Sequence, residues 1–414
     1  GWDLVLTPYI RDVEMSFVQH FLPGQPVEDF SHASLGMQAA GYRDLDSGAR
    51  FALGFDLEYT DAALQQFQPN PTTGSFFLIN TLPQGQHYDY EVEAQQIAGF
   101  VSYEQEIAEG WDLSFGMRLE NLNYQYDNLM IDGRTDEFGV ACALGCRYSR
   151  PADREDSFSN LSPKFGLSYS FDDDHKLQFR VQRGFRAPQA TELYRLQNDQ
   201  SVADLSSVEL DSYELTMFDR GSGFGSGSSS GSEWNYSISL YFMNKQNEIF
   251  QNSARENLND SHTQHRGLEL ELGYELTEAL SAQAVVNYVK HSYENSRLSG
   301  GIDIKGNDVD TAPNSFGNLR LNWQATPALV TELEWVMMGE YFTNPENTAE
   351  YDGHNLINLR GRYQTNEDLS FSLNLMNLTN ERYAERADWT SFTGDRYFPG
   401  EGLRAFFAID WSFN

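Results

Sequence analysis

The sequence has neither a long hydrophobic run nor a large supply of basic residues. In its 414 residues, no stretch approaches the ~18 consecutive apolar residues of a membrane-spanning helix. This excludes a helical span but leaves a β-barrel open, because lipid-facing and lumen-facing residues alternate along barrel strands. Lys and Arg total 28 against 61 Asp and Glu, a formal net charge of −33. A nucleic-acid binder would be basic, so the charge excludes nucleic acid as a partner.

Cysteine is almost absent, and the two that are present, Cys142 and Cys146, lie in the short segment ACALGC. Such a pair predicts a small disulfide loop formed in an oxidising compartment, with two free thiols as the alternative. Without a nearby histidine pair, two thiolates make a poor zinc site. His262 and His265 cannot chelate one metal together, since residues three apart on a strand point to opposite faces. We therefore expect no metal site.

Catalytic motifs are also missing. The chain contains no GxSxG, no HExxH and no glycine fingerprint after a strand. Glu269 and Glu271 resemble paired catalytic carboxylates, but they belong to a regular repeat along a strand face. We expect the protein not to be an enzyme and to hold no resident cofactor.

What the chain has instead is an alternation of apolar and polar residues with a period of two. It is clear in residues 112–121, 176–182, 268–275 and 369–376. Strands of this kind have one dry face and one wet face. In residues 268–275 the pattern predicts that Leu270 faces lipid and Glu271 faces a lumen. Aromatic residues make up 14% of the chain, enough for the interfacial girdles of a membrane barrel.

The connections alternate between short turns and long polar segments. The short turns are 43–48, 106–110, 171–175, 276–279, 325–328 and 364–368; the long segments are 61–92, 128–158, 187–207, 293–311, 343–353 and 378–401. This alternation predicts an all-β, transmembrane antiparallel β-barrel with its long loops outside, containing about sixteen strands. The Gly/Ser-rich segment 220–234 falls on the short-turn rim, where we interpret it as an insertion of open role.

Four segments resemble the TonB-dependent outer-membrane receptors. They are GFRAPQATELY (184–194), HRGLELELGYEL (265–276), NLMNLTNERYAE (374–385) and YFPGEGLRAFFAIDWSF (397–413), in that family's order. The family's members are 22-stranded barrels with an N-terminal plug. The resemblance implies that residues 1–414 are the C-terminal barrel portion, with the plug and first strands missing. A small natural barrel without a plug is the alternative.

The resemblance also implies a function. We expect a monomer, surrounded by bacterial outer-membrane lipid, that imports a scarce solute with energy from the TonB inner-membrane complex through the missing N-terminal region. The expected ligand is a ferric siderophore or a similar iron chelate. The alternatives are a passive porin-like channel and a surface protein that does not transport.

The candidate site residues form two sets, one in the segment 184–194 and the other in the long connection 378–401. By resemblance, Arg186, Glu192 and Tyr194 lie in the upper lumen, where they contact plug or ligand or only shape the barrel wall. The last long segment contributes a second set that suits a flat, anionic chelate, namely Arg382, Tyr383, Trp389, Arg396 and Tyr397. For these residues an aromatic girdle and ordinary ion pairs with neighbouring carboxylates remain the alternatives.

If the first strands are missing, the two ends of the sheet should not pair. We expect an open seam between the first strand, near Asp3–Phe21, and the last, Leu403–Phe413. We also expect a lumen empty of protein and lined by Arg180, Gln182, Glu269, Glu271, Ser372 and Asn374.

Overall fold

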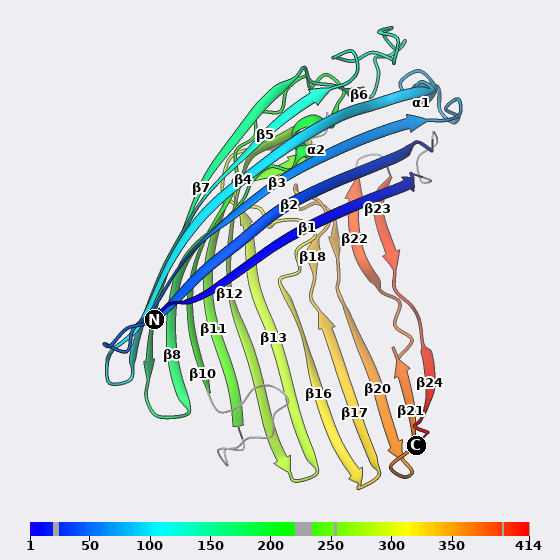
Figure 1. The fold of residues 1–414 in the computed structure, drawn as a ribbon. Coiled ribbons are helices and arrows are strands. Elements are labelled where there is room, and N and C mark those ends of the chain that lie inside the picture. Colours follow the sequence, from blue (N-terminus) through cyan, green and yellow to red (C-terminus); the bar gives the residue numbers. More distant parts are fainter. Residues whose placement is uncertain (20–24, 220–233, 252–254, 391–392, 414) are drawn as a thin grey trace.

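The computed structural model describes residues 1–19, 25–219, 234–251, 255–390 and 393–413. Within them, sixteen long strands form one antiparallel sheet in chain order (Figure 1). These strands are β1 (Asp3–Val18), β2 (Val27–Asp44), β3 (Arg50–Gln68), β4 (Gly85–Ala108), β5 (Trp111–Asn128), β7 (Arg154–Ser170), β8 (His175–Arg186), β10 (Val208–Asp219), β11 (Trp234–Gln251), β12 (Asn257–Thr277), β13 (Leu280–Tyr293), β16 (Ser315–Thr326), β17 (Leu329–Met338), β20 (His354–Gln364), β21 (Leu369–Met376) and β24 (Arg404–Trp411).

Short elements occupy the loops between these strands. Four two-stranded ladders are formed by β6 (Tyr148–Ser149) with β9 (Leu196–Gln197), β14 (Leu298–Ser299) with β15 (Ile302–Asp303), β18 (Tyr341–Phe342) with β19 (Glu350–Tyr351), and β22 (Ala384–Thr390) with β23 (Gly394–Pro399). The described residues also contain two short helices, α1 (Phe76–Ile79) and α2 (Ala190–Tyr194), which the sequence pattern did not predict. No helix in the described ranges has the length and apolar character needed to cross a membrane.

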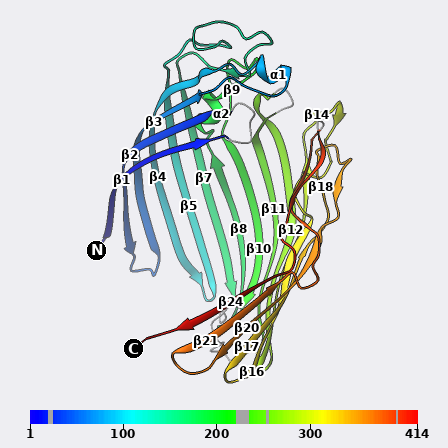
Figure 2. The same ribbon diagram turned by 90° about the vertical axis from the view of Figure 1, so that its right-hand side faces the viewer.

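The sheet curves but stays open. β1 and β24 form its two edges, and no ladder joins them within the described residues. Figures 1 and 2 show them as separate edges of the curved sheet. Side chains at these edges are exposed, with Ile10 on β1 at 81% and Phe407 on β24 at 64%. The open seam that the sequence predicted is therefore present.

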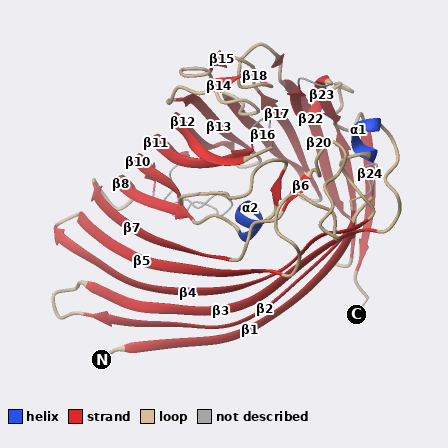
Figure 3. Cartoon of the chain, turned by 90° about the horizontal axis from the view of Figure 1, so that it is seen from above, coloured by secondary structure: helices blue, strands red, loops and turns tan. Residues whose placement is uncertain are grey.

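The two faces of the sheet can be assigned from its register. Figure 3 shows α2 inside the curve of the strands, and Tyr194 of α2 stacks on Tyr126 of β5, so Tyr126 marks the luminal face. Directly opposed residues share a face. By alternation along β5, Glu120 shares the luminal face with Tyr126. From Glu120, directly opposed pairs carry the assignment strand by strand to His265 of β12. These pairs are Glu120–Asn160, Lys164–Gln182, Gln182–Ser212, Ser212–Met243 and Met243–His265. By alternation along β12, Glu271 is then luminal and Leu270 faces outward, as predicted.

The luminal wall is held by charges paired across neighbouring strands. Glu334 of β17 binds both Arg320 of β16, at 2.9 Å, and Arg360 of β20, at 2.8 Å. Arg180 of β8 pairs with Glu214 of β10 at 3.1 Å. The remaining residues predicted to line the lumen share this face through their registers. These residues are Gln182, Glu269, Glu271, Ser372 and Asn374.

Two details of the sequence prediction need correction. Residues 61–92 are not one long loop, because β3 continues to Gln68 and β4 begins at Gly85. The ends of these strands carry polar residues on both faces, which resembles a loop in sequence, yet their backbones remain paired. The other long segments correspond to loops, and 187–207 is the whole connection between β8 and β10. Of the Gly/Ser-rich segment 220–234, only Trp234 lies within the described residues.

The lumen is also not empty of protein at its outer end. The loops 129–153 and 187–207, called the infolded loops from here on, pack against the luminal face of β3 to β7. With side chains of these strands they form the larger of the two buried apolar clusters found among the described residues. Hydrophobic burial of this kind fixes loops that would otherwise remain solvated.

Candidate functional site

The infolded loops are anchored by α2. Its Tyr194 is fully buried, with its ring stacked on Tyr126 at a centroid distance of 4.3 Å. The Tyr194 hydroxyl donates a hydrogen bond to Asp156 of β7 at 2.8 Å. Leu193 and Leu196 are also fully buried. In this structure Tyr194 supports the loop through these contacts, which fits the alternative in which the segment shapes the barrel wall.

Arg186 and Glu192 make the turn from β8 into α2. The guanidinium donates to both carboxylate oxygens, with Nη1–Oε2 at 2.8 Å and Nη2–Oε1 at 3.1 Å. The backbone N–H of Gln189 also donates to Glu192, at 2.8 Å, which closes a capping box at the start of α2. Their contacts thus fit the alternative in which this segment shapes the wall and fixes the exit of the chain.

A disulfide joins Cys142 and Cys146, the pairing predicted from the sequence, with an S–S distance of 2.08 Å. The ring is tied to the loop after α1, because the N–H of Arg147 donates to the carbonyl oxygen of Thr81 at 2.9 Å. Immediately afterwards, β6 pairs with β9 next to α2. The disulfide therefore fixes the start of β6 and, with it, the direction of Arg147 and Tyr148.

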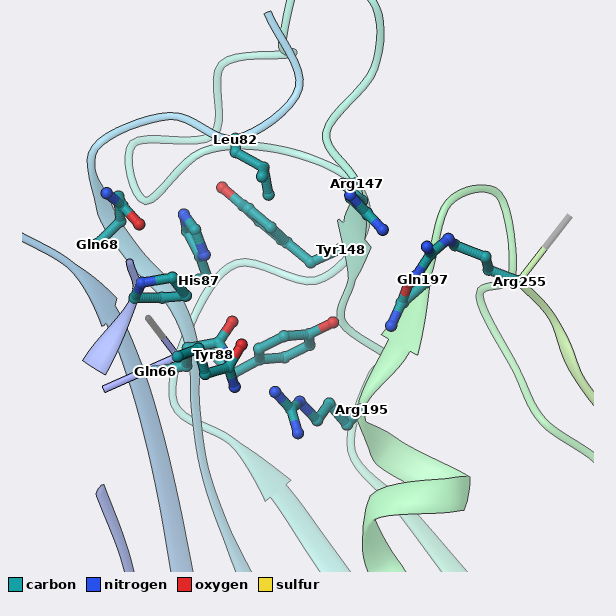
Figure 4. A pocket seen from close by; sticks show the side chains of 12 residues that line it. Gln66, Gln68, Leu82, His87, Tyr88, Arg147, Tyr148, Arg195, Gln197 and Arg255 are labelled. Carbon is teal, nitrogen blue, oxygen red and sulfur yellow. Dashed lines mark hydrogen bonds between the residues drawn. The ribbon is translucent and has the colours of Figure 1, made fainter. Parts of the chain in front are cut away.

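Between β6, β9 and the outer ends of β2 to β4 lies a cavity of about 200 Å³. Figure 4 shows three arginines along one side of it and glutamine and histidine side chains along the other. The lining residues are Gln19, Pro26, Gln66, Gln68, Leu82, His87, Tyr88, Arg147, Tyr148, Arg195, Gln197 and Arg255. We call this cavity the arginine pocket.

The arginine pocket carries positive charge that the described carboxylates neutralise only at Arg195. Arg195 forms an ion pair with Glu28 at 2.5 Å. Arg255 donates to the side-chain oxygen of Gln197 at 3.2 Å, and within the described part of the chain no carboxylate pairs with Arg255 or Arg147. Burial, with the adjacent Arg255 guanidinium, lowers the pKa of Arg147. Two unpaired guanidiniums side by side favour an anion between them.

Sequence reasoning missed these three arginines. They come from separate segments, and only the folding of the infolded loops brings them together. The one available signal was Arg147, a basic residue directly after the second cysteine of a strongly acidic chain.

The second set of predicted residues lies in another cluster. It belongs to residues 377–403, called the last loop, which pack on Tyr341 and Tyr351 through Ala384 and Ala387. Arg396 donates to Asp388 at 2.6 Å, so it forms the ordinary ion pair that the sequence left open. The structure does not gather this set with Arg186, Glu192 and Tyr194, which belong to the infolded loops.

The aromatic residues of the last loop are only partly covered. The ring of Tyr383 lies 4.7 Å from that of His354, and Tyr397 is 55% exposed. Trp389 is half-buried, and its backbone N–H donates to the carbonyl oxygen of Thr343. Arg382 is exposed. These residues offer an open polar and aromatic surface rather than an enclosed cavity.

Comparisons with known proteins agree with this architecture. The family model described as TonB dependent receptor-like, beta-barrel, matches residues 2–378. Comparison with curated protein sequences gives no match.

Among solved structures, the ferric yersiniabactin uptake receptor FyuA from Yersinia pestis superposes with a TM-score of 0.73 at 14% identity, covering 100% of this chain and 59% of that one. The siderophore receptor PiuA from Acinetobacter baumannii gives 0.73 at 15% identity, covering 99% and 62%. The copper transporter OprC gives 0.73 at 14% identity, covering 100% and 62%. The chain thus spans about three fifths of the length of these structures, and at these identities the likeness shows the fold.

The open antiparallel sheet, the long loops on one rim and the match over residues 2–378 lead to one family. The chain belongs to the TonB-dependent receptors, a family of β-barrel transport receptors of the bacterial outer membrane that are not enzymes.

Proposed function

We propose that this protein imports a ferric siderophore across the outer membrane with energy delivered through TonB. Family membership supports TonB-dependent transport. Of the similar structures, one is named for ferric yersiniabactin, one for a siderophore and one for copper, which supports a metal or metal chelate as the cargo.

The arginine pocket is the observation that carries the choice of ligand. Its lining comes from β6 and β9 in the infolded loops and from the outer ends of β3 and β4, which places it at the rim of the long loops. Arg147 and Arg255 supply unneutralised guanidiniums, and Tyr88 and Tyr148 supply aromatic surface. Many iron chelates combine a planar aromatic part with anionic oxygens, and guanidinium binds such oxygens in a bidentate manner.

The test is uptake of labelled iron by cells that express the full-length protein and lack other receptors of this kind. The probes are iron(III) complexes of citrate, of a tris-catecholate and of a neutral tris-hydroxamate. We expect uptake of an anionic complex that disappears when TonB is deleted. Uptake that continues without TonB would contradict the proposal and indicate the passive porin-like channel.

Two variants connect uptake with the pocket. Arg147→Gln and Arg255→Gln should each weaken binding of the anionic complex on the order of tenfold, because each removes a charge-assisted hydrogen bond. Arg50→Gln is the matched control, since Arg50 lies on the short-turn rim and its side chain is 64% exposed. Equal loss in all three variants would show that the pocket does not select the ligand.

A further inference from the structure

Two histidines face each other on the luminal wall away from the arginine pocket. His265 of β12 and His291 of β13 are directly opposed in the ladder. Their Nδ1 atoms lie 2.6 Å apart, and the ring planes are inclined by 66° at a centroid distance of 4.9 Å. At most one of these two nitrogens can carry a proton in that contact. The lone pair of the other nitrogen accepts that proton, so both Nδ1 atoms point into the same space, which a shared metal ion would occupy in place of the proton.

A third donor stands beside them. Met243 of β11 is directly opposed to His265 on its other side. Directly opposed residues share a face, with Cβ atoms about 4.5–5.5 Å apart. Three consecutive strands thus present a thioether, an imidazole and a second imidazole in one row. The backbone ladders between the strands fix the spacing of that row.

The ring of His265 is held in the required orientation. Its Nε2 lies 3.1 Å from the hydroxyl of Thr263, two residues earlier on the same face of β12. Histidines that bind metals commonly engage their second nitrogen in this way, which fixes the tautomer and the ring direction. With Nε2 occupied by Thr263, Nδ1 of His265 is the nitrogen left to bind.

The row lies beyond the apolar band of the barrel. On the outward face of the same strands, five of the six residues next to the row are polar. These six residues are Phe242, Asn244, Gln264, Arg266, Lys290 and Ser292. The lipid-facing positions of β12 closer to the turn are Leu268, Leu270 and Leu272. A solute that enters from the loop side would meet the row in the outer part of the lumen.

We propose that Met243, His265 and His291 form a binding site for copper(I). Thioether and imidazole ligands together favour this soft ion over magnesium, calcium or manganese, which prefer oxygen. The described residues contain no cluster of three His, Cys, Asp or Glu side chains suited to a harder metal. Two metal–nitrogen bonds of about 2.0–2.1 Å at a tetrahedral angle place the nitrogens roughly 3.3 Å apart. Small side-chain rotations supply that change.

This site also explains what sequence reasoning overlooked. His262 and His265 lie three residues apart on β12 and therefore point to opposite faces of the strand. The effective partner of His265 lies on the next strand, at a position set by the register of the β12–β13 hairpin. The proposal is independent of the siderophore function, since the row and the arginine pocket share no residue.

Silver(I) is the probe of choice, because it mimics copper(I) without the reductant that would open the Cys142–Cys146 disulfide. Isothermal titration of the purified full-length protein should show one silver(I) bound. Thr263→Val removes the orienting hydroxyl and should reduce silver(I) affinity on the order of tenfold. His265→Asn and His291→Asn each remove a ligand and should reduce silver(I) affinity by more than that. Met243→Leu keeps the volume and should weaken silver(I) binding while leaving any zinc(II) binding unchanged.

The controls are His175→Asn and Met117→Leu, a histidine at the start of β8 near the opposite rim and a methionine on the outward face of β5. Circular dichroism confirms that each variant is folded. A wild-type protein that binds no silver(I) would overturn the proposal without reference to any variant. Silver(I) affinity that is unchanged in His265→Asn and His291→Asn would overturn it as well. If Met117→Leu and Met243→Leu weaken silver(I) binding equally, the Met243 thioether is not a ligand of the site.

Discussion

The infolded loops and the last loop occupy the same rim of the barrel but are built differently. The infolded loops bury Leu193 and Tyr194 completely and are closed by a disulfide. The last loop buries Ala384 and Ala387, both small, and leaves Tyr397 more than half exposed. Large buried side chains stabilise a loop far more than small ones, because the hydrophobic contribution scales with the apolar area removed from water.

This difference determines what each region can do for binding. In the infolded loops the guanidinium of Arg147 is placed before a ligand arrives and no described carboxylate pairs with it, so less conformational entropy is lost on binding. In the last loop Asp388 already binds Arg386, at 2.9 Å, and Arg396, at 2.6 Å. A ligand there would compete with pairs that exist. The infolded loops are therefore the preformed side of the rim.

The largest expected effect is in Tyr194→Ala. Removal of a fully buried ring stacked on Tyr126 should cost about 3–5 kcal/mol of local stability, because the cavity cannot be filled by its neighbours. Hydrogen–deuterium exchange of α2 and β6 measures this loss. Tyr397→Ala is the matched control in the last loop, where the loss of local stability should stay within about 0.5 kcal/mol. Equal effects would remove the contrast between the two regions.

The second largest loss of stability is expected from a substitution in the barrel wall that carries both regions. Leu270→Arg should destabilise the membrane-inserted protein by about 2–4 kcal/mol near the midplane, less near an interface, since Leu270 faces outward. Glu271→Gln should be tolerated, because Glu271 faces the lumen. Folding equilibria in lipid vesicles measure both variants. If the two behave alike, the register assigned to β12 is wrong.

Loss of the disulfide should have a smaller effect. The Cys142–Cys146 bridge closes a short ring, and the chain-entropy model assigns such a ring about 2 kcal/mol. Cys142→Ser should therefore speed amide exchange around Arg147 and Tyr148 without changing exchange in the last loop. Alkylation of the unreduced, folded wild-type protein should detect no thiol, and labelling there would contradict the pairing.

The parts of the structure that follow from local rules were predictable. Strict alternation assigned Leu270 and Glu271 to opposite faces, and the length of the connections separated the two rims of the barrel. Cysteine spacing predicted the disulfide. In each case the deciding information lies within a few consecutive residues, so no knowledge of distant contacts is needed.

Features that depend on several distant segments were not predictable. Arg147, Arg195 and Arg255 meet only after the infolded loops pack on the wall. The pairing of His265 with His291 depends on the register across a hairpin, which a single strand does not reveal. The buried position of Tyr194 is of the same kind, because its partners Tyr126 and Asp156 lie on other strands.

The smallest expected effect comes from Glu192, which performs two tasks at the edge of the infolded loops. It caps α2 through the N–H of Gln189 and pairs with Arg186. The ion pair is partly exposed, with 44% of the Arg186 side chain and 24% of the Glu192 side chain accessible, so it contributes at most about 1 kcal/mol. The cap contributes about 1 kcal/mol more. Glu192→Gln keeps a capping oxygen and loses only the charge, whereas Glu192→Ala loses both.

Exchange of the α2 amides should therefore accelerate modestly in Glu192→Gln and further in Glu192→Ala. Arg396→Gln is the counterpart in the last loop, where Arg386 continues to bind Asp388 and little change is expected. If Glu192→Gln and Glu192→Ala are equally destabilised, the charge accounts for the whole effect and the capping box for none. If Arg396→Gln exceeds both, the last loop is the more tightly held region, and the assignment of the infolded loops as the preformed side of the rim fails.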